Sequence, residues 1–191
     1  GLRHLLDREI PAQFRIVPHE ISALSRQVLI DLPDIDSHYE SSIAITRTML
    51  RHLLFPIWVQ SVEKYADQRP QLLLKQVAQG NDPGNFHFVL TKADQAPDEA
   101  SARDLAADYA ARIARTLGLA SPPDVAVVSA RHVDDFDLPP LRATLSQHKS
   151  AERVAQATQA ANLQRDRTLL TWIDAQNLTE KIARLARLET E

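Results

Sequence analysis

Three short polar strings each follow an apolar run, and their residue types could bind a ligand. The first is Asp31-Leu32-Pro33-Asp34-Ile35-Asp36, the second is Thr91-Lys92-Ala93-Asp94, and the third is Ser129-Ala130. In an open parallel sheet, ligands bind beyond the carboxyl ends of the strands. Carboxylates placed there can hold a hard divalent cation or accept paired hydrogen bonds from a base. The pattern therefore predicts one polar site at the carboxyl edge of a sheet.

The elements that must position these strings alternate between strand and helix. Apolar runs predict strands, and three- or four-residue spacing with capping residues predicts the helices between them. Gly80 and Gly118 are suited to end two of the helices in a left-handed cap. We predict an α/β fold with a mostly parallel sheet and flanking helices. The predicted strands are 14–17, 27–32, 55–62, 86–90 and 125–128, and the predicted helices are 37–53, 69–79, 97–117 and one that opens near Pro139-Pro140.

Residues 150–191 differ in kind from the rest of the chain. They contain no glycine or proline, and apolar residues recur at mixed three- and four-residue steps. We therefore divide the chain into a domain over residues 1–149 and a C-terminal helix or helical pair over 150–191. This helical segment either packs against the domain or serves as an arm for self-association.

Composition excludes several classes of function. The 191 residues are 44% hydrophobic, carry a net charge of −3 and contain no cysteine. Nucleic-acid binding requires a concentrated basic surface, which this balance does not favour. The lack of cysteine excludes disulfides, thiolate metal sites and a cysteine nucleophile. No apolar stretch approaches the roughly 20 residues of a membrane-spanning helix, so we expect a soluble chain, and the lack of cysteine is compatible with the cytoplasmic location that we expect.

The ordered strings resemble those of the P-loop GTPases. In that family a D-x-x-G string, an N/T-K-x-D string and an S-A string follow successive strands, and Asp31-Leu32-Pro33 looks like the start of the DLPG of the dynamin-like branch. The resemblance covers roughly residues 14–149 and implies GTP or GDP and magnesium as ligands. It implies that Asp31 contacts magnesium through water and that Asp94 accepts hydrogen bonds from the guanine base. Thr91, Lys92, Ser129 and Ala130 would complete the guanine site, with Lys92 packed along the base and the Ala130 N–H bound to guanine O6.

The chain also departs from the family pattern. Asp34 stands near the phosphate, where the family has the glycine of D-x-x-G, and Ile35 stands where small GTPases often place the glutamine that orients water. No G-x-x-x-x-G-K-[ST] phosphate loop is present in the 191 residues. We expect this chain to lack the first strand, phosphate loop and first switch of a larger GTPase that binds and hydrolyses GTP. The chain alone is then expected to be inactive, and the dynamin-like relatives imply peripheral membrane contact for the full-length protein.

Two other interpretations remain open. One is a noncatalytic scaffold derived from a GTPase, which works through its helical tail. The other is a phosphatase of the haloacid-dehalogenase type, with Asp34 and Asp36 as nucleophile and general acid, Thr91 as the phosphate-binding hydroxyl, and Asp134-Asp135 as the magnesium pair.

Overall fold

A small parallel sheet forms the centre of the molecule. The computed structural model describes residues 17–18, 20–22, 28–32, 46, 49, 53–176 and 180–181. Within these residues the strands are β1 (Ile57–Ser61), β2 (His87–Thr91) and β3 (Val125–Val127). They pair in the order β1-β2-β3, and both pairings are parallel. The predicted α/β architecture with parallel strands is confirmed at this level.

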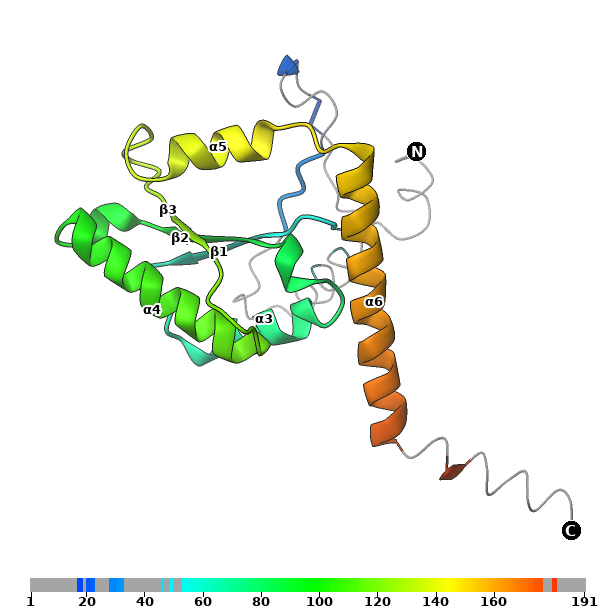
Figure 1. The fold of residues 1–191 in the computed structure, drawn as a ribbon. Coiled ribbons are helices and arrows are strands. Elements are labelled where there is room, and N and C mark those ends of the chain that lie inside the picture. Colours follow the sequence, from blue (N-terminus) through cyan, green and yellow to red (C-terminus); the bar gives the residue numbers. More distant parts are fainter. Residues whose placement is uncertain are drawn as a thin grey trace, which may run out of the picture.

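Helices lie on both sides of the sheet (Figure 1). In that view α3 (Gln68–Ala78) and α4 (Glu99–Leu117) lie below it, and α5 (Leu138–Ser146) lies above it. The longest described helix, α6 (Ala151–Ala175), stands beside the sheet and runs well past it. Two short 3-10 turns, η2 (Pro83–Asn85) and η3 (Ala93–Gln95), flank β2. Each helix predicted between residues 68 and 149 is present, and the predicted C-terminal helical segment is helical over Ala151–Ala175, whereas most of its residues after 176 lie outside the described ranges.

The core lies between the sheet and the helices α3 and α4. Trp58, Phe88 and Leu90 are buried in one hydrophobic cluster with Leu74 of α3 and Ile113 of α4. Phe88 and Leu90 are alternate residues of β2, and the α4 members of the cluster recur at three- or four-residue spacing, as expected for an amphipathic helix packed on one face of a sheet: Ala102, Ala106, Tyr109 and Ile113. Burying each large side chain contributes about 1.5–3 kcal/mol, so this cluster determines which face of the sheet the helices cover.

The two predicted glycine caps have different outcomes. Gly118 follows α4 with a φ of +67°, and its N–H donates to the Ala114 carbonyl. Gly80 is not a left-handed cap of α3, because its φ is not positive, and the C-cap residue Gln79 has right-handed helical backbone angles. The prediction for Gly80 is therefore wrong. The chain beyond α3 turns through Asn81 instead, whose buried amide donates to the Leu53 carbonyl at 2.7 Å.

The predicted buried strand 27–32 is also wrong for its described residues. Residues 28–32 have no regular secondary structure, and the Val28 and Leu29 side chains are 56% and 66% exposed. A strand requires a hydrogen-bonded neighbour, and a local apolar run cannot supply one. Asp31 therefore does not follow a buried strand.

Some predictions fall wholly or partly outside the described residues. Residues 14–16 of the first predicted strand, Asp34 and most of the predicted helix 37–53 lie there. Of that helix, Thr46, Met49 and Leu53 are described; Thr46 and Met49 are helical and buried, whereas Leu53 is not helical. Within the described ranges, no helix is both long enough and apolar enough to cross a bilayer.

Candidate functional site at the carboxyl edge of the sheet

The loop after β2 leaves the strand through an uncommon backbone conformation. Lys92 follows Thr91, the last residue of β2, with φ of 62° and ψ of 34°, in the left-handed region that few non-glycine residues adopt. The next N–H, that of Ala93, donates to the Val128 carbonyl at 3.1 Å. This bond joins the loop after β2 to the chain just beyond β3. The strings that begin at Thr91 and at Ser129 are therefore adjacent in space.

A hydrogen bond between Asp94 and Ser129 links the second and third strings directly. The Ser129 hydroxyl donates to Asp94 Oδ1 at 2.7 Å. Ser129 is fully buried, and its oxygen also accepts the backbone N–H groups of Arg131 at 3.1 Å and His132 at 3.3 Å. The Asp94 side chain is 11% exposed. Because both partners are nearly buried, this bond holds the carboxylate in one orientation.

The environment of Asp94 favours its ionised form. The hydrogen bond from Ser129 is the main cause that lowers the pKa of the Asp94 carboxyl, and the positive charge of Arg131 adds to it. Arg131 Nη1 lies 3.6 Å from Asp94 Oδ2, and the Arg131 side chain is 79% exposed. An exposed ion pair of this kind is weak. Oδ2 can therefore exchange Arg131 for another hydrogen-bond donor at little cost.

Lys92 forms an ion pair across the same edge. Its ammonium group donates to Glu63 Oε2, which lies just beyond β1, and both side chains are about half exposed. The residues that follow β1 thus contact the string that follows β2, which is itself bonded to the string that follows β3. Ala130, directly after Ser129, is exposed in the loop beyond β3.

The structure therefore brings five of the predicted site residues to one edge of the sheet. They are Thr91, Lys92, Asp94, Ser129 and Ala130. Asp134 and Asp135, the pair in the phosphatase interpretation, are exposed in the loop after β3, and Asp135 Oδ2 lies 3.7 Å from His132 Nδ1.

Asp31 lies in a groove beside β1 rather than in the Asp94 cluster. The groove has a volume of about 560 Å³, and its polar lining includes Asp31, Ser61, Lys64 and Thr91. Asp94, Ser129 and Ala130 do not line it. Thr91 lines this groove and is also the first residue of the Thr91–Asp94 string, which is predicted to bind guanine. In the described part of the chain, no three His, Asp or Glu side chains gather as metal ligands.

Sequence reasoning missed two residues that shape this edge. Arg131 pairs with Asp94, and its position directly after Ser129-Ala130 was a usable signal. Asp137 was not identifiable from any local pattern. Its carboxylate accepts the Val127 N–H and the Arg103 guanidinium, and its own N–H donates to the Val127 carbonyl. Burial opposes ionisation of the Asp137 carboxyl, but these hydrogen bonds outweigh it, and the pKa is lowered.

Comparisons with known proteins give no information about function, so the functional proposal has to be argued from the residues and geometry of this site. No protein-family model, no curated protein and no solved structure matches this chain.

Proposed function

We propose that this chain is the guanine-binding part of a GTPase domain similar to the dynamin-like P-loop GTPases. The observation that carries the proposal is the Asp94 carboxylate, which is oriented by buried Ser129 at the sheet edge where the strings with Lys92 and Ala130 are joined. Sequence order and the carboxyl-edge position of the strings support it further.

The chemistry of the carboxylate explains why guanine is the proposed base. Two carboxylate oxygens accept two parallel N–H donors, and guanine offers such a pair at N1 and N2. Adenine has no such pair of donors on its Watson–Crick edge, so Asp94 would disfavour it. Arg131 would yield Oδ2 to the base, and Lys92 would leave Glu63 to pack along the ring. The Ala130 N–H would donate to guanine O6.

A magnesium ion would rely on few protein ligands. Mg²⁺ keeps several waters and takes one or two carboxylates together with phosphate oxygens. Asp31 lines the groove with Ser61 and Thr91 and would act through a bound water. Such a site needs no group of three protein ligands. Asp34, proposed near the phosphate, lies outside the described residues.

The 191 residues supply base recognition without a phosphate loop. Each hydrogen bond to the base is worth about 1–3 kcal/mol at most, so we expect this chain to bind GTP and GDP weakly. Hydrolysis would belong to a longer protein that contributes the phosphate loop. In the scaffold interpretation, that loop is absent from the whole protein.

The experiment compares two nucleotides on two variants. Fluorescent analogues of GTP and XTP are titrated against the wild type and against Asp94→Asn. Xanthine has a carbonyl in place of the guanine amine, and an asparagine amide can donate to it. We expect the preference for GTP to be lost and XTP to bind better than GTP in Asp94→Asn, with a combined change of about tenfold or more.

The control is Asp98→Asn, the same substitution at an exposed helix N-cap outside the strings. Asp98 accepts the Ser101 N–H at 2.7 Å, and asparagine caps helices equally well. This variant is expected to keep the wild-type preference. An unchanged GTP-to-XTP ratio in Asp94→Asn would refute the proposal, because a folding defect alone would weaken both nucleotides together.

A further inference from the structure

The loop after β3 returns to the strand that it leaves. It runs over residues 128–136 and turns back on itself before α5 (Figure 1). At its end the Asp137 N–H donates to the Val127 carbonyl at 2.8 Å, and Asp137 Oδ2 accepts the Val127 N–H at 2.8 Å. One residue thus binds both main-chain groups of the last residue of β3. These two bonds close the loop at its base.

Further contacts fix Asp137 at this point. Arg103 of α4 donates to the same carboxylate oxygen, and the Asp137 carbonyl accepts the Leu141 N–H at 2.9 Å in the first turn of α5. Phe136, directly before Asp137, has a φ of 54° and packs against the hydrophobic cluster of the core. A left-handed backbone costs about 1–2 kcal/mol for such a residue, so it persists because the surrounding contacts hold it.

The carboxyl end of β3 is held from both sides. On the inner side the Val128 N–H donates to the Leu90 carbonyl at 2.9 Å, and on the outer side Asp137 binds Val127. Ser129 is the next residue along the chain. The direction in which Ser129 leaves the sheet therefore depends on the contacts of both sides.

The residues beyond Ser129 contribute little to hold this direction. Residues 130–135 are exposed, so they bury little apolar surface that could fix the loop. The Ser129 hydroxyl donates to Asp94 at 2.7 Å and also accepts the Arg131 and His132 N–H groups. Hydrogen bonds weaken steeply when their angles depart from the preferred range, so a shift of the loop would weaken the bond to Asp94.

We propose that Asp137 is a positioning residue for Asp94: it closes the loop after β3 so that the Ser129 hydroxyl stays bonded to the Asp94 carboxylate. Asp137 lies outside the predicted strings and acts on Asp94 through Val127 and Ser129. The consequence for the guanine base rests on the proposed function, whereas the effect on the Asp94 carboxylate does not.

The test measures the pKa of Asp94 by NMR titration in two variants of Asp137. Asp137→Ala loses the side-chain bond to Val127, so we expect the pKa of Asp94 to rise toward its ordinary value as the Ser129 bond weakens. Loss of a negative charge by itself would lower the pKa of a neighbouring carboxyl, so the expected rise is opposite in sign to a charge effect. Asp137→Asn loses the same charge but keeps an oxygen for the Val127 N–H, and the pKa of Asp94 should stay close to that of the wild type.

Asp108→Ala tests whether Asp137 merely stabilises the fold. Asp108 accepts the Arg112 guanidinium at 2.7 Å further along α4, so this variant removes a comparable contact. We expect the pKa of Asp94 to be unchanged in Asp108→Ala. The proposal is overturned if Asp137→Ala leaves the pKa of Asp94 unchanged, or if Asp137→Asn or Asp108→Ala raises it equally.

A second pair of variants decides the question if Asp137→Ala does not fold. Arg103→Met removes the α4 contact of Asp137, and Arg112→Met is the matched control because each arginine also pairs with an acid four residues before it. The titrations are run in about 1 M salt, where charges are screened beyond about 3 Å. Arg103→Met should raise the pKa of Asp94 and Arg112→Met should not, and equal values in the two variants would refute the role of Asp137.

Nucleotide titration separates this inference from the proposed function. Asp137→Ala should bind a fluorescent GTP analogue about tenfold or more weakly than the wild type, and Asp137→Asn should recover most of that loss. A wild type that does not distinguish GTP from XTP would refute the proposed function alone, because the titration of Asp94 contains no nucleotide.

Discussion

Two side chains determine the state of the carboxylate at the candidate site. Ser129 donates to Asp94 from a fully buried position, and Arg131 approaches the other oxygen from solvent. The buried contact fixes orientation and lowers the pKa, while the exposed contact is replaceable. This asymmetry suits a group that must stay ionised and still exchange one partner for a ligand.

Removal of the Ser129 hydroxyl should raise the pKa of Asp94. In Ser129→Ala the carboxylate loses its main hydrogen bond, so the pKa is expected to move up toward the ordinary value of about 3.9. The loss also leaves the Arg131 and His132 N–H groups without their acceptor, at about 1–3 kcal/mol of unfolding free energy. Carboxyl titration by NMR measures the pKa, and urea unfolding measures the free energy.

The stability difference between the wild type and Ser129→Ala should depend on pH and should be smaller in acid. A lowered pKa in the folded state adds stability that is fully present above the ordinary value and is lost as the pH falls through the folded pKa. The difference in unfolding free energy between the wild type and Ser129→Ala should therefore become smaller as the pH falls below about 4. Ser121→Ala, in an exposed loop, serves as the control and should stay within about 0.5 kcal/mol of the wild type. A gap that widens at low pH would contradict the role of this bond.

At the scale of elements, capping residues explain where α4 begins and ends. Asp98 accepts the Ser101 N–H at the amino end, and Gly118 adopts the left-handed conformation at the carboxyl end. Both signals lie within a few residues of the helix, so the sequence alone predicts them. The end of α3 depends instead on Asn81, whose partner Leu53 is 28 residues away. A local pattern cannot contain that contact, which is why Gly80 was misassigned.

The two glycines give a matched pair of substitutions. Gly118→Ala should destabilise the protein by about 1 kcal/mol or more, because the left-handed backbone at this position is strained for alanine. Steric clash does not contribute, since an added Cβ would meet no atom within 4 Å. Gly80→Ala should be neutral or slightly stabilising, since its φ is not positive and the nearest atom to a Cβ is 3.9 Å away. Thermal unfolding of both variants measures the difference. Equal effects would contradict the assignment of the two caps.

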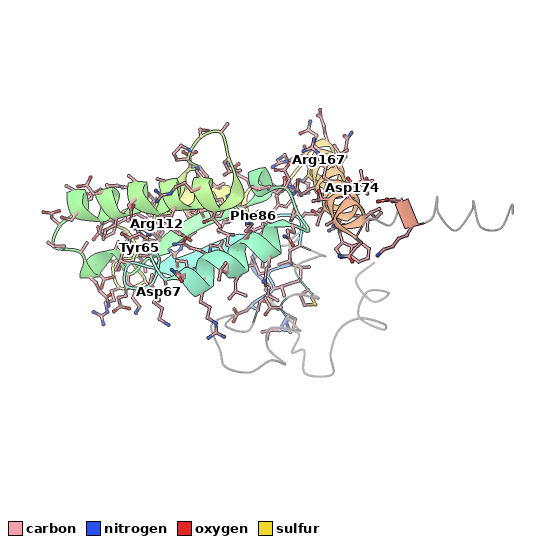
Figure 2. The ribbon with its side chains drawn as sticks, turned by 90° about the horizontal axis from the view of Figure 1, so that it is seen from below. Tyr65, Asp67, Phe86, Arg112, Arg167 and Asp174 are labelled. Atoms are coloured by element: carbon pink, nitrogen blue, oxygen red, sulfur yellow. The ribbon has the colours of Figure 1, made fainter. Side chains whose placement is uncertain are left out.

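At the scale of the whole molecule, polar contacts hold the long helix to the body. Buried Asn85 donates to Asn81 Oδ1 at 3.1 Å and to the Ala157 carbonyl at 3.2 Å, while Arg153 donates to Asn85 at 3.3 Å. Further along, Arg165 donates to the Gly80 carbonyl at 2.8 Å. These contacts lie at the amino ends of the strands, opposite the candidate site. Figure 2 shows Arg167 and Asp174 of α6 far from Tyr65 and Arg112 at the other side of the body.

Loss of the Asn85 side chain should loosen α6 without disturbing the sheet. Asn85→Ala leaves Asn81 Oδ1 without this donor in a buried environment, so we expect a loss of about 1–3 kcal/mol. Amide hydrogen exchange should accelerate in the first turns of α6 more than in β2. Gln159→Ala, an exposed site on the same helix, is the control and should change stability by less than about 0.5 kcal/mol. Equal acceleration in β2 would indicate global destabilisation rather than release of the helix.

The sequence alone determined the elements and their order from residue 55 onward. Apolar alternation, helical spacing and caps act over a few residues, so β1, β2, α4 and the polar strings at their ends were predictable. The tertiary structure decided which distant groups meet. It joined Asp94 to Ser129 and Asp137 to Val127, and it left Val28–Leu32 across a groove from β1 rather than in the sheet. Those outcomes depend on contacts between residues ten or more positions apart, and no local pattern of residues encodes them.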